Sequence, residues 1–222
     1  MDVKKVVKSN AIWLVFIAMV IVFSIANPNF IKPSNLVAIS RQVAVYGIAS
    51  IGMTFVILIA GIDLSTGSII TLVNIVCAYM MVNMGVNMWV ALIISLIIAT
   101  LVGVLNGFMV STLGMPALIA TFASQTVFEG IAYLICGGMP ISGFDPNFDL
   151  FGRWSLGIVP ISAIIMIVCF VVGSFILNKS YFGRYFYAIG GNEEAAELSG
   201  IRGSRMKYPI YALSGFFAGL AG

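Results

Sequence analysis

Charged residues and histidine are the scarcest groups in this chain of 222 residues. It has no histidine, and 9% of its residues are charged, against about 25% in soluble domains. With so few ligating side chains, a Ser-His-Asp triad and a zinc site are excluded. The net charge of +3 is not gathered into a basic patch interleaved with aromatics, so we expect no nucleic acid as a partner.

Cysteine is also rare. Cys77, Cys136 and Cys169 stand far apart inside apolar stretches, without the C-x-x-C spacing of a redox or metal motif. Free cysteine behaves as a small apolar residue. We therefore interpret all three as packing residues, and we expect no metal and no cofactor on this chain.

Hydrophobic residues, in contrast, make up 61% of the sequence, more than a soluble core of this size can bury. They form runs close to the 17–25 residues that cross the hydrocarbon core of a membrane. The runs cover residues 11–26, 43–60, 69–84, 88–110, 116–136 and 156–177. We predict an all-α, polytopic integral membrane protein with six complete transmembrane helices, in a single domain over residues 1–222.

A seventh apolar run starts at Tyr208 and reaches Gly222 after 15 residues. A helix of that length spans roughly 22 Å, less than the roughly 30 Å of a hydrocarbon core. We therefore expect the seventh helix to be truncated, and a chain extended beyond residue 222 to be more stable and more active.

Lysines and arginines divide unevenly between the two sides of the predicted membrane. If the N-terminus lies inside, eight of them fall in inner segments and three in outer ones. The positive-inside rule favours this orientation, with a cytoplasmic N-terminus and a cytoplasmic segment at residues 179–207. The inner residues are Lys4, Lys5, Lys8, Lys179, Arg184, Arg202, Arg205 and Lys207, and the outer ones are Lys32, Arg41 and Arg153.

Residues 61–68 (GIDLSTGS) interrupt the apolar pattern between the second and third runs. A carboxylate in a membrane span costs about 2.5–3.5 kcal/mol on insertion scales, so Asp63, with Ser65 and Ser68, is a candidate for the substrate pathway. Glycines and hydroxyls of this kind occur where a discontinuous helix lines a cavity. The alternative is that Asp63 and the two serines cap the following helix at the aqueous boundary.

Polar residues also follow one face of the fifth run. Thr121, Gln125 and Glu129 are spaced by four residues, which places them along one side of a helix. We expect this side to contact protein or water in preference to lipid. It would serve either a transport pathway or hydrogen bonding between helices.

Small residues repeat at the same spacing in two other runs. One set is Gly103, Gly107 and Ser111, and the other is Gly215 with Gly219. Because small side chains let helix backbones approach closely, we predict that these faces pack against neighbouring helices.

The longest polar stretch, residues 182–201, has the features of one short helix. Two glycines predict a turn, Asn192 is a good N-cap, and Gly200 predicts the end of the helix. The helix would cover residues 193–199, about 10 Å, which is too short to be stable alone in water. Its three glutamates argue against an anionic membrane surface, so we predict that it docks on a protein.

Two of these stretches resemble the ribose/galactose-type ABC importer permeases. Residues 61–68 are similar to that family's GIDLS-x-GS signature, and residues 182–201 (FGRYFYAIGGNEEAAELSGI) resemble its cytoplasmic coupling segment. Residues 28–30 and 211–215 fit as well, so the resemblance spans nearly the whole chain. It implies docking in a groove of a cytoplasmic ATPase through Gly190, Gly191, Asn192, Glu193, Ala195, Ala196, Leu198, Ser199 and Gly200.

The resemblance implies the rest of the transport system too. Such a permease imports a monosaccharide by alternating access across a bacterial inner membrane, as a homodimer or a heterodimer. A periplasmic or extracellular binding protein delivers the sugar, and the partner ATPase holds ATP and Mg. This chain has no G-x-x-x-x-G-K-[ST] loop, in agreement with hydrolysis on another subunit. Family members are longer, so we expect this chain to be incomplete at its C-terminus.

The sugar and the energy source are left open by the residues themselves. Residues 140–145 (PISGFD) are closer to galactose-type members, whereas the two longer motifs fit both types. The main alternative is an ion-coupled secondary transporter that uses Asp63 and Glu129. An integral membrane enzyme is less favoured, because acid–base groups are few. The ABC importer would depend on an ATPase, whereas the ion-coupled transporter would depend on a proton or sodium gradient.

Overall fold

A computed structural model describes residues 11–144, 148 and 154–222. Over these residues the regular secondary structure is helical apart from one two-stranded hairpin, which confirms the predicted all-α class. The elements are α2 (Ala11–Ala26), α3 (Pro33–Leu58), α4 (Thr66–Val82), α5 (Met88–Ser111), α6 (Ala117–Cys136), β1 (Ser155–Leu156), β2 (Val159–Pro160), α8 (Ile161–Lys179), α9 (Tyr181–Gly191), α10 (Glu193–Leu198) and α11 (Gly203–Ala221). Lys4, Lys5, Lys8 and Arg153, used in the charge count, lie outside the described residues.

Four of these helices, α3, α5, α6 and α8, are long and apolar enough to cross a membrane. The helices α2 and α4 are apolar but shorter, with 16 and 17 residues. The chain is thus a multi-pass membrane protein, while the predicted number of six complete spans and a seventh remains a prediction.

Three helix starts differ from the sequence-based ones by five residues or more. Helix α11 begins at Gly203, five residues before the predicted start at Tyr208, so it has 19 residues and not the 15 of the apolar run. Helix α3 begins at Pro33, ten residues before the apolar run, because proline is well suited to the first turn of a helix. Helix α8 begins later than predicted, at Ile161, because residues 155–160 form the hairpin. Gly157 lies in the turn of this hairpin with a φ of 66°.

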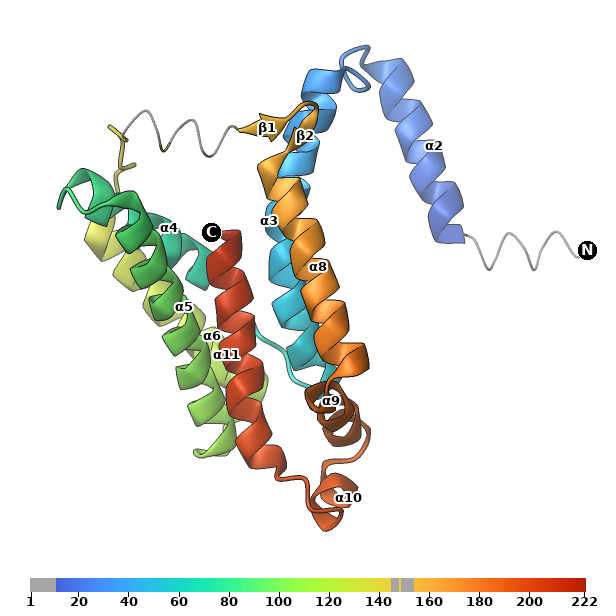
Figure 1. Ribbon diagram of the computed structural model, residues 1–222, viewed down its shortest axis with the longest axis vertical. Coiled ribbons are helices and arrows are strands. Elements are labelled where there is room, and N and C mark those ends of the chain that lie inside the picture. Colours follow the sequence, from blue (N-terminus) through green and yellow to red (C-terminus); the bar gives the residue numbers. More distant parts are fainter. Residues whose placement is uncertain (1–10, 145–147, 149–153) are drawn as a thin grey trace, which may run out of the picture.

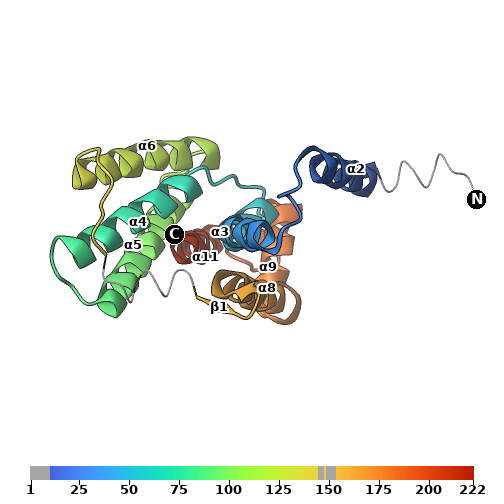
Figure 2. The ribbon, with the colours of Figure 1, turned by 90° about the horizontal axis from the view of Figure 1, so that it is seen from above.

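Helix α11 lies at the centre of the bundle, between α5 and α4 on one side and α3 on the other (Figures 1 and 2). Helix α6 packs on α4 and α5, and α8 packs on α3. Helix α2 stands apart from the bundle in both views and has no buried residue. A helix that is apolar on every side, as α2 is, suits a lipid environment.

The contact between α5 and α11 is close because both helices present glycine. A Cβ atom added at Gly103 would lie 2.2 Å from the backbone oxygen of Tyr211, and one added at Gly215 would lie 2.4 Å from that of Ala99. Neither position has room for a larger residue at this backbone separation. The predicted packing role of these small residues is confirmed.

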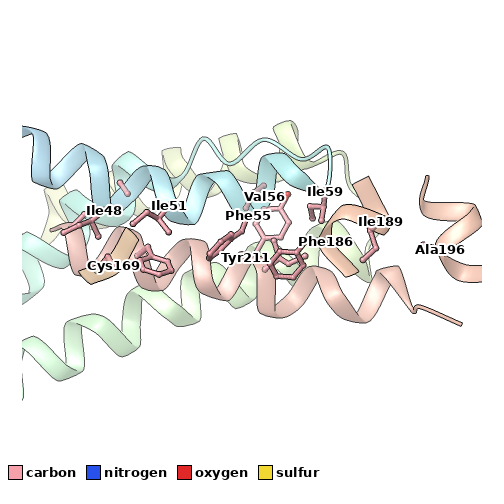
Figure 3. Close-up of a cluster of buried hydrophobic side chains, with 14 residues drawn as sticks. Ile48, Ile51, Phe55, Val56, Ile59, Cys169, Phe186, Ile189, Ala196 and Tyr211 are labelled. Carbon is pink, nitrogen blue, oxygen red and sulfur yellow. The ribbon is translucent and has the colours of Figure 1, made fainter. Parts of the chain in front are cut away.

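Buried side chains between α3, α8, α9 and α11 form the larger of two apolar clusters (Figure 3). Phe55 lies near its centre, with its ring 5.8 Å from that of Phe186 and 5.9 Å from that of Phe217. Cys169 belongs to this cluster, and Cys77 is buried elsewhere, so these two cysteines pack as predicted. Cys136 is half-buried at the end of α6.

Candidate functional site

The first candidate site is the break between α3 and α4. Helix α3 ends at Leu58, and α4 begins at Thr66, so seven residues lie outside the helices. The N–H group of Gly61 donates to the carbonyl of Val56 at 3.0 Å, and Ala60 takes a left-handed conformation with a φ of 58°. This is the geometry of a helix C-terminal cap, with alanine where glycine is usual.

Asp63 lies in this break with 1% of its surface exposed. Its Oδ1 accepts hydrogen bonds from the N–H of Ser65 at 3.0 Å and from the hydroxyl of Ser65 at 2.6 Å. Its Oδ2 accepts from the hydroxyl of Ser214 on α11 at 2.8 Å. The carboxylate is therefore inside the bundle, rather than at an aqueous boundary.

Further hydrogen bonds connect Asp63 to α5 and α6. The amide of Asn106 donates to Ser65 Oγ at 2.7 Å, and the hydroxyl of Ser124 donates to Asn106 Oδ1. All of these residues are buried. We call this set of residues the polar cluster: Asp63, Ser65, Asn106, Ser124 and Ser214.

Thr121 attaches the same break to α6 directly. The N–H of Leu64 donates to Thr121 Oγ1 at 3.1 Å, and Thr121 is fully buried. Through Thr121 and the polar cluster, the break is fastened to α5, α6 and α11, three helices that are distant in the sequence. Such a buried, hydrogen-bonded network holds one arrangement of the helices.

The predicted polar face of α6 divides in the structure. Thr121 is buried, Gln125 is half-buried, and Glu129 is exposed. A spacing of four residues turns by about 40° at each step around a helix of 3.6 residues per turn, so the face drifts outward. Ser124, three residues after Thr121, stays on the inner side and joins the polar cluster.

Ser68 remains local, since its hydroxyl donates to the carbonyl of Ser65 in the first turn of α4 at 2.8 Å. The residues that sequence reasoning missed are Asn106, Ser124, Ser214 and Tyr211. Asn106 carried a usable signal, because it is a lone amide in a long apolar run. Tyr211 is fully buried, and its hydroxyl has no partner among the described residues.

The second candidate site is the segment formed by α9 and α10. Gly190 and Gly191 were predicted to make a turn, but they form the end of α9. Helix α9 was not predicted at all, although Phe182, Phe186 and Ile189 have helical spacing. Phe186 and Ile189 are buried in the large apolar cluster. This tertiary contact keeps the chain helical as far as Gly190 and Gly191, although glycine by itself favours a turn.

Helix α10 agrees with its prediction. Asn192 Oδ1 accepts a hydrogen bond from the N–H of Ala195 at 3.0 Å, so Asn192 is the N-cap. The N–H of Ile201 donates to the carbonyl of Ala196 at 2.9 Å, and Gly200 has a φ of 86°. This is the glycine-dependent ending that the sequence predicts.

The two faces of α10 differ. Ala196 is 6% exposed and packs into the apolar cluster of this chain, whereas Leu198 is 92% exposed. Glu193 forms an ion pair with Lys207 of α11 at 2.7 Å. The outward face available to a partner consists of Glu194, Ala195, Glu197, Leu198 and Ser199.

Known proteins resemble this chain over most of its length. Residues 35–222 match the protein family described as the permease component of branched-chain amino acid transport systems. The chain is 46% identical to the ribose import permease RbsC of Bacillus subtilis over 206 residues, which cover 92% of this chain and 64% of that protein. It is 37% identical to RbsC of Escherichia coli K12 over 219 residues, covering 97% and 67%.

The L-arabinose transport system permease AraH of Escherichia coli K12 is 34% identical over 209 residues, which cover 94% of this chain and 63% of AraH. The chain thus spans about two thirds of the length of the relatives it matches. No solved structure matches it. Since the family match covers residues 35–222, the chain belongs to the family of ABC transporter permease components that includes the ribose import permeases.

Proposed function

We propose that this chain is part of the membrane-spanning subunit of a bacterial ABC importer that moves a monosaccharide into the cytoplasm. The observation that carries the proposal is the 46% identity to a ribose import permease over 92% of the chain. An apolar helical bundle supports it, since such a subunit must cross the bilayer.

In this proposal a separate cytoplasmic ATPase binds ATP and Mg and drives alternating access in the permease. Helix α10 docks on it through the outward face that carries Leu198. The leucine is 92% exposed, and this supports docking, because a protein partner would remove its apolar surface from water. The same face carries Glu194 and Glu197, which disfavour an anionic lipid surface.

The proposed orientation places the N-terminus, α9 and α10 in the cytoplasm. The charge bias of the sequence supports it. The hairpin β1–β2 then faces the outside, where a periplasmic or extracellular sugar-binding protein would dock. A second permease copy, identical or related, completes the membrane part.

An ion-coupled carrier would need a carboxylate that binds and releases the driving ion. Asp63 already accepts three hydrogen bonds from Ser65 and Ser214, and Glu129 lies exposed on α6. This arrangement favours a structural role for Asp63, and with it the ATP-driven mechanism.

The test is uptake of labelled ribose into proteoliposomes that contain the native transport complex and its binding protein. We expect uptake that requires ATP and persists when proton and sodium gradients are collapsed. Competition by unlabelled galactose and arabinose then ranks the sugars. Uptake that disappears with the gradients despite ATP would refute the ATP-driven mechanism.

A further inference from the structure

Gly190, at the end of α9, lies against the carbonyl group of the last residue of α3. A Cβ atom added at Gly190 would lie 1.7 Å from the oxygen of Leu58 and 2.9 Å from its carbonyl carbon. No side chain fits at that distance, so this backbone contact requires glycine. At the neighbouring Gly191 an added Cβ meets no atom within 4 Å, so the constraint is specific to position 190.

Side chains extend the contact between α9 and α3 (Figure 3). Phe186 of α9 is fully buried, with its ring 5.8 Å from that of Phe55 on α3. Ile189 lies in the same cluster as Ile59, the residue that follows α3. Because close-packed interiors have low compressibility, a displacement of α9 also displaces the end of α3.

Helix α10 has a second attachment, through α11. Glu193 at the start of α10 pairs with Lys207 near the start of α11. About one turn further along α11, the hydroxyl of Tyr211 lies 2.9 Å from where a Cβ of Gly61 would be. The next turn carries Ser214, which donates its hydrogen bond to Asp63.

Both attachments lead from α10 to the break at residues 59–65. Helix α9 contacts the turn of α3 that directly precedes the break, and α11 contacts two residues within it. We propose that α9 and α11 transmit a displacement of α10 to this break, and that Gly190 is the positioning residue that keeps α9 seated on α3. The inference rests on the proposed function, in which an ATPase moves α10. Packed elements that share contacts are a physical route for such coupling.

The test compares Gly190→Ala with Gly130→Ala, since Gly130 is a helical glycine of α6 where an added Cβ meets no atom within 4 Å. The measurement is the ratio of ribose uptake to ATP hydrolysis in proteoliposomes with the native complex, per assembled ATPase. We expect Gly190→Ala to lower this ratio by about 5-fold or more, in the range of coupling between distant sites, and Gly130→Ala to leave it unchanged. An unchanged ratio in the Gly190→Ala complex would overturn the proposal.

If the Gly190→Ala complex does not assemble, the same ratio of ribose uptake to ATP hydrolysis is measured in the Phe186→Leu complex. This substitution removes the ring contact with Phe55 and adds no atom that must be accommodated. A lowered ratio supports transmission through α9, and a wild-type ratio overturns it. Failure of the proposed function is visible separately, because the wild-type vesicles would then take up ribose without ATP or not at all.

Discussion

At the scale of single residues, Asp63 stands out as a carboxylate buried in a membrane protein. Such a group costs about 2.5–3.5 kcal/mol on insertion scales. Hydrogen bonds from Ser65 and Ser214 offset part of that cost in the folded bundle. Removing the carboxylate would leave these buried donors without an acceptor, at about 1–3 kcal/mol for each.

Asp63→Asn and Asp63→Leu are therefore expected to differ. The asparagine oxygen can accept the hydrogen bonds from Ser65, and its amide can donate to Ser214, so we expect most ATP-driven uptake to remain. Leucine accepts no hydrogen bond, so we expect loss of folding or of transport. The measurement is uptake with collapsed ion gradients, together with thermal unfolding in detergent. If Asp63→Asn abolished uptake in a protein of unchanged stability, the structural role of Asp63 would be wrong.

Ala60 is strained, because its φ of 58° lies in the left-handed region. This conformation costs an L-residue about 1–2 kcal/mol, so Ala60→Gly should raise stability by up to about 1 kcal/mol after the entropy cost of glycine. The matched control is Ala123→Gly in α6, an exposed helical alanine, which should lower stability. Unfolding midpoints in detergent test both, and a loss of stability in Ala60→Gly would contradict the strain argument.

At the scale of elements, α10 depends on local chemistry and α9 on tertiary contacts. The cap of α10 links Asn192 to an N–H group three residues away. We expect Asn192→Ala to destabilise the start of this helix by about 1 kcal/mol, whereas Asn192→Asp keeps an oxygen that can cap it. Hydrogen exchange of α10 should then be about 5-fold faster in Asn192→Ala. Equal exchange in the two variants would show that the cap contributes nothing.

Leu198 should contribute more to docking than Ala196, because it faces outward and Ala196 faces the chain's own core. We expect Leu198→Ser to reduce the amount of ATPase that co-purifies with the permease, without change in membrane insertion. The control is Leu156→Ser, an exposed leucine of the hairpin on the proposed outer side. A similar loss in both variants would mean that the outward face of α10 is not the docking site.

At the scale of the whole molecule, orientation can be tested by cysteine labelling. With Cys136→Ser as background, the remaining cysteines, Cys77 and Cys169, are buried. A membrane-impermeant maleimide should label Trp154→Cys in intact cells and Leu198→Cys only after permeabilisation. Labelling of Leu198→Cys in intact cells would reverse the orientation and exclude docking of α10 on a cytoplasmic ATPase.

The sequence alone determined features that depend on composition and on neighbours a few residues apart. The membrane class follows from 61% hydrophobic and 9% charged residues. The cap at Asn192 and the ending at Gly200 involve groups within five residues of each other. The glycines of α5 and α11 indicated close packing, because a residue without a side chain lets any neighbouring helix backbone approach it closely.

Only the tertiary structure decided which groups satisfy Asp63, where α9 lies and which face of α10 is free. Ser214 is 151 residues from Asp63 along the chain, and Asn106 is 41 residues from Ser65. The sequence pattern of a single helix does not identify such a partner, because the pairing depends on how α4, α5 and α11 cross. Helix α9 ends in two glycines that locally favour a turn, and the burial of Phe186 and Ile189 against α3 outweighs that preference.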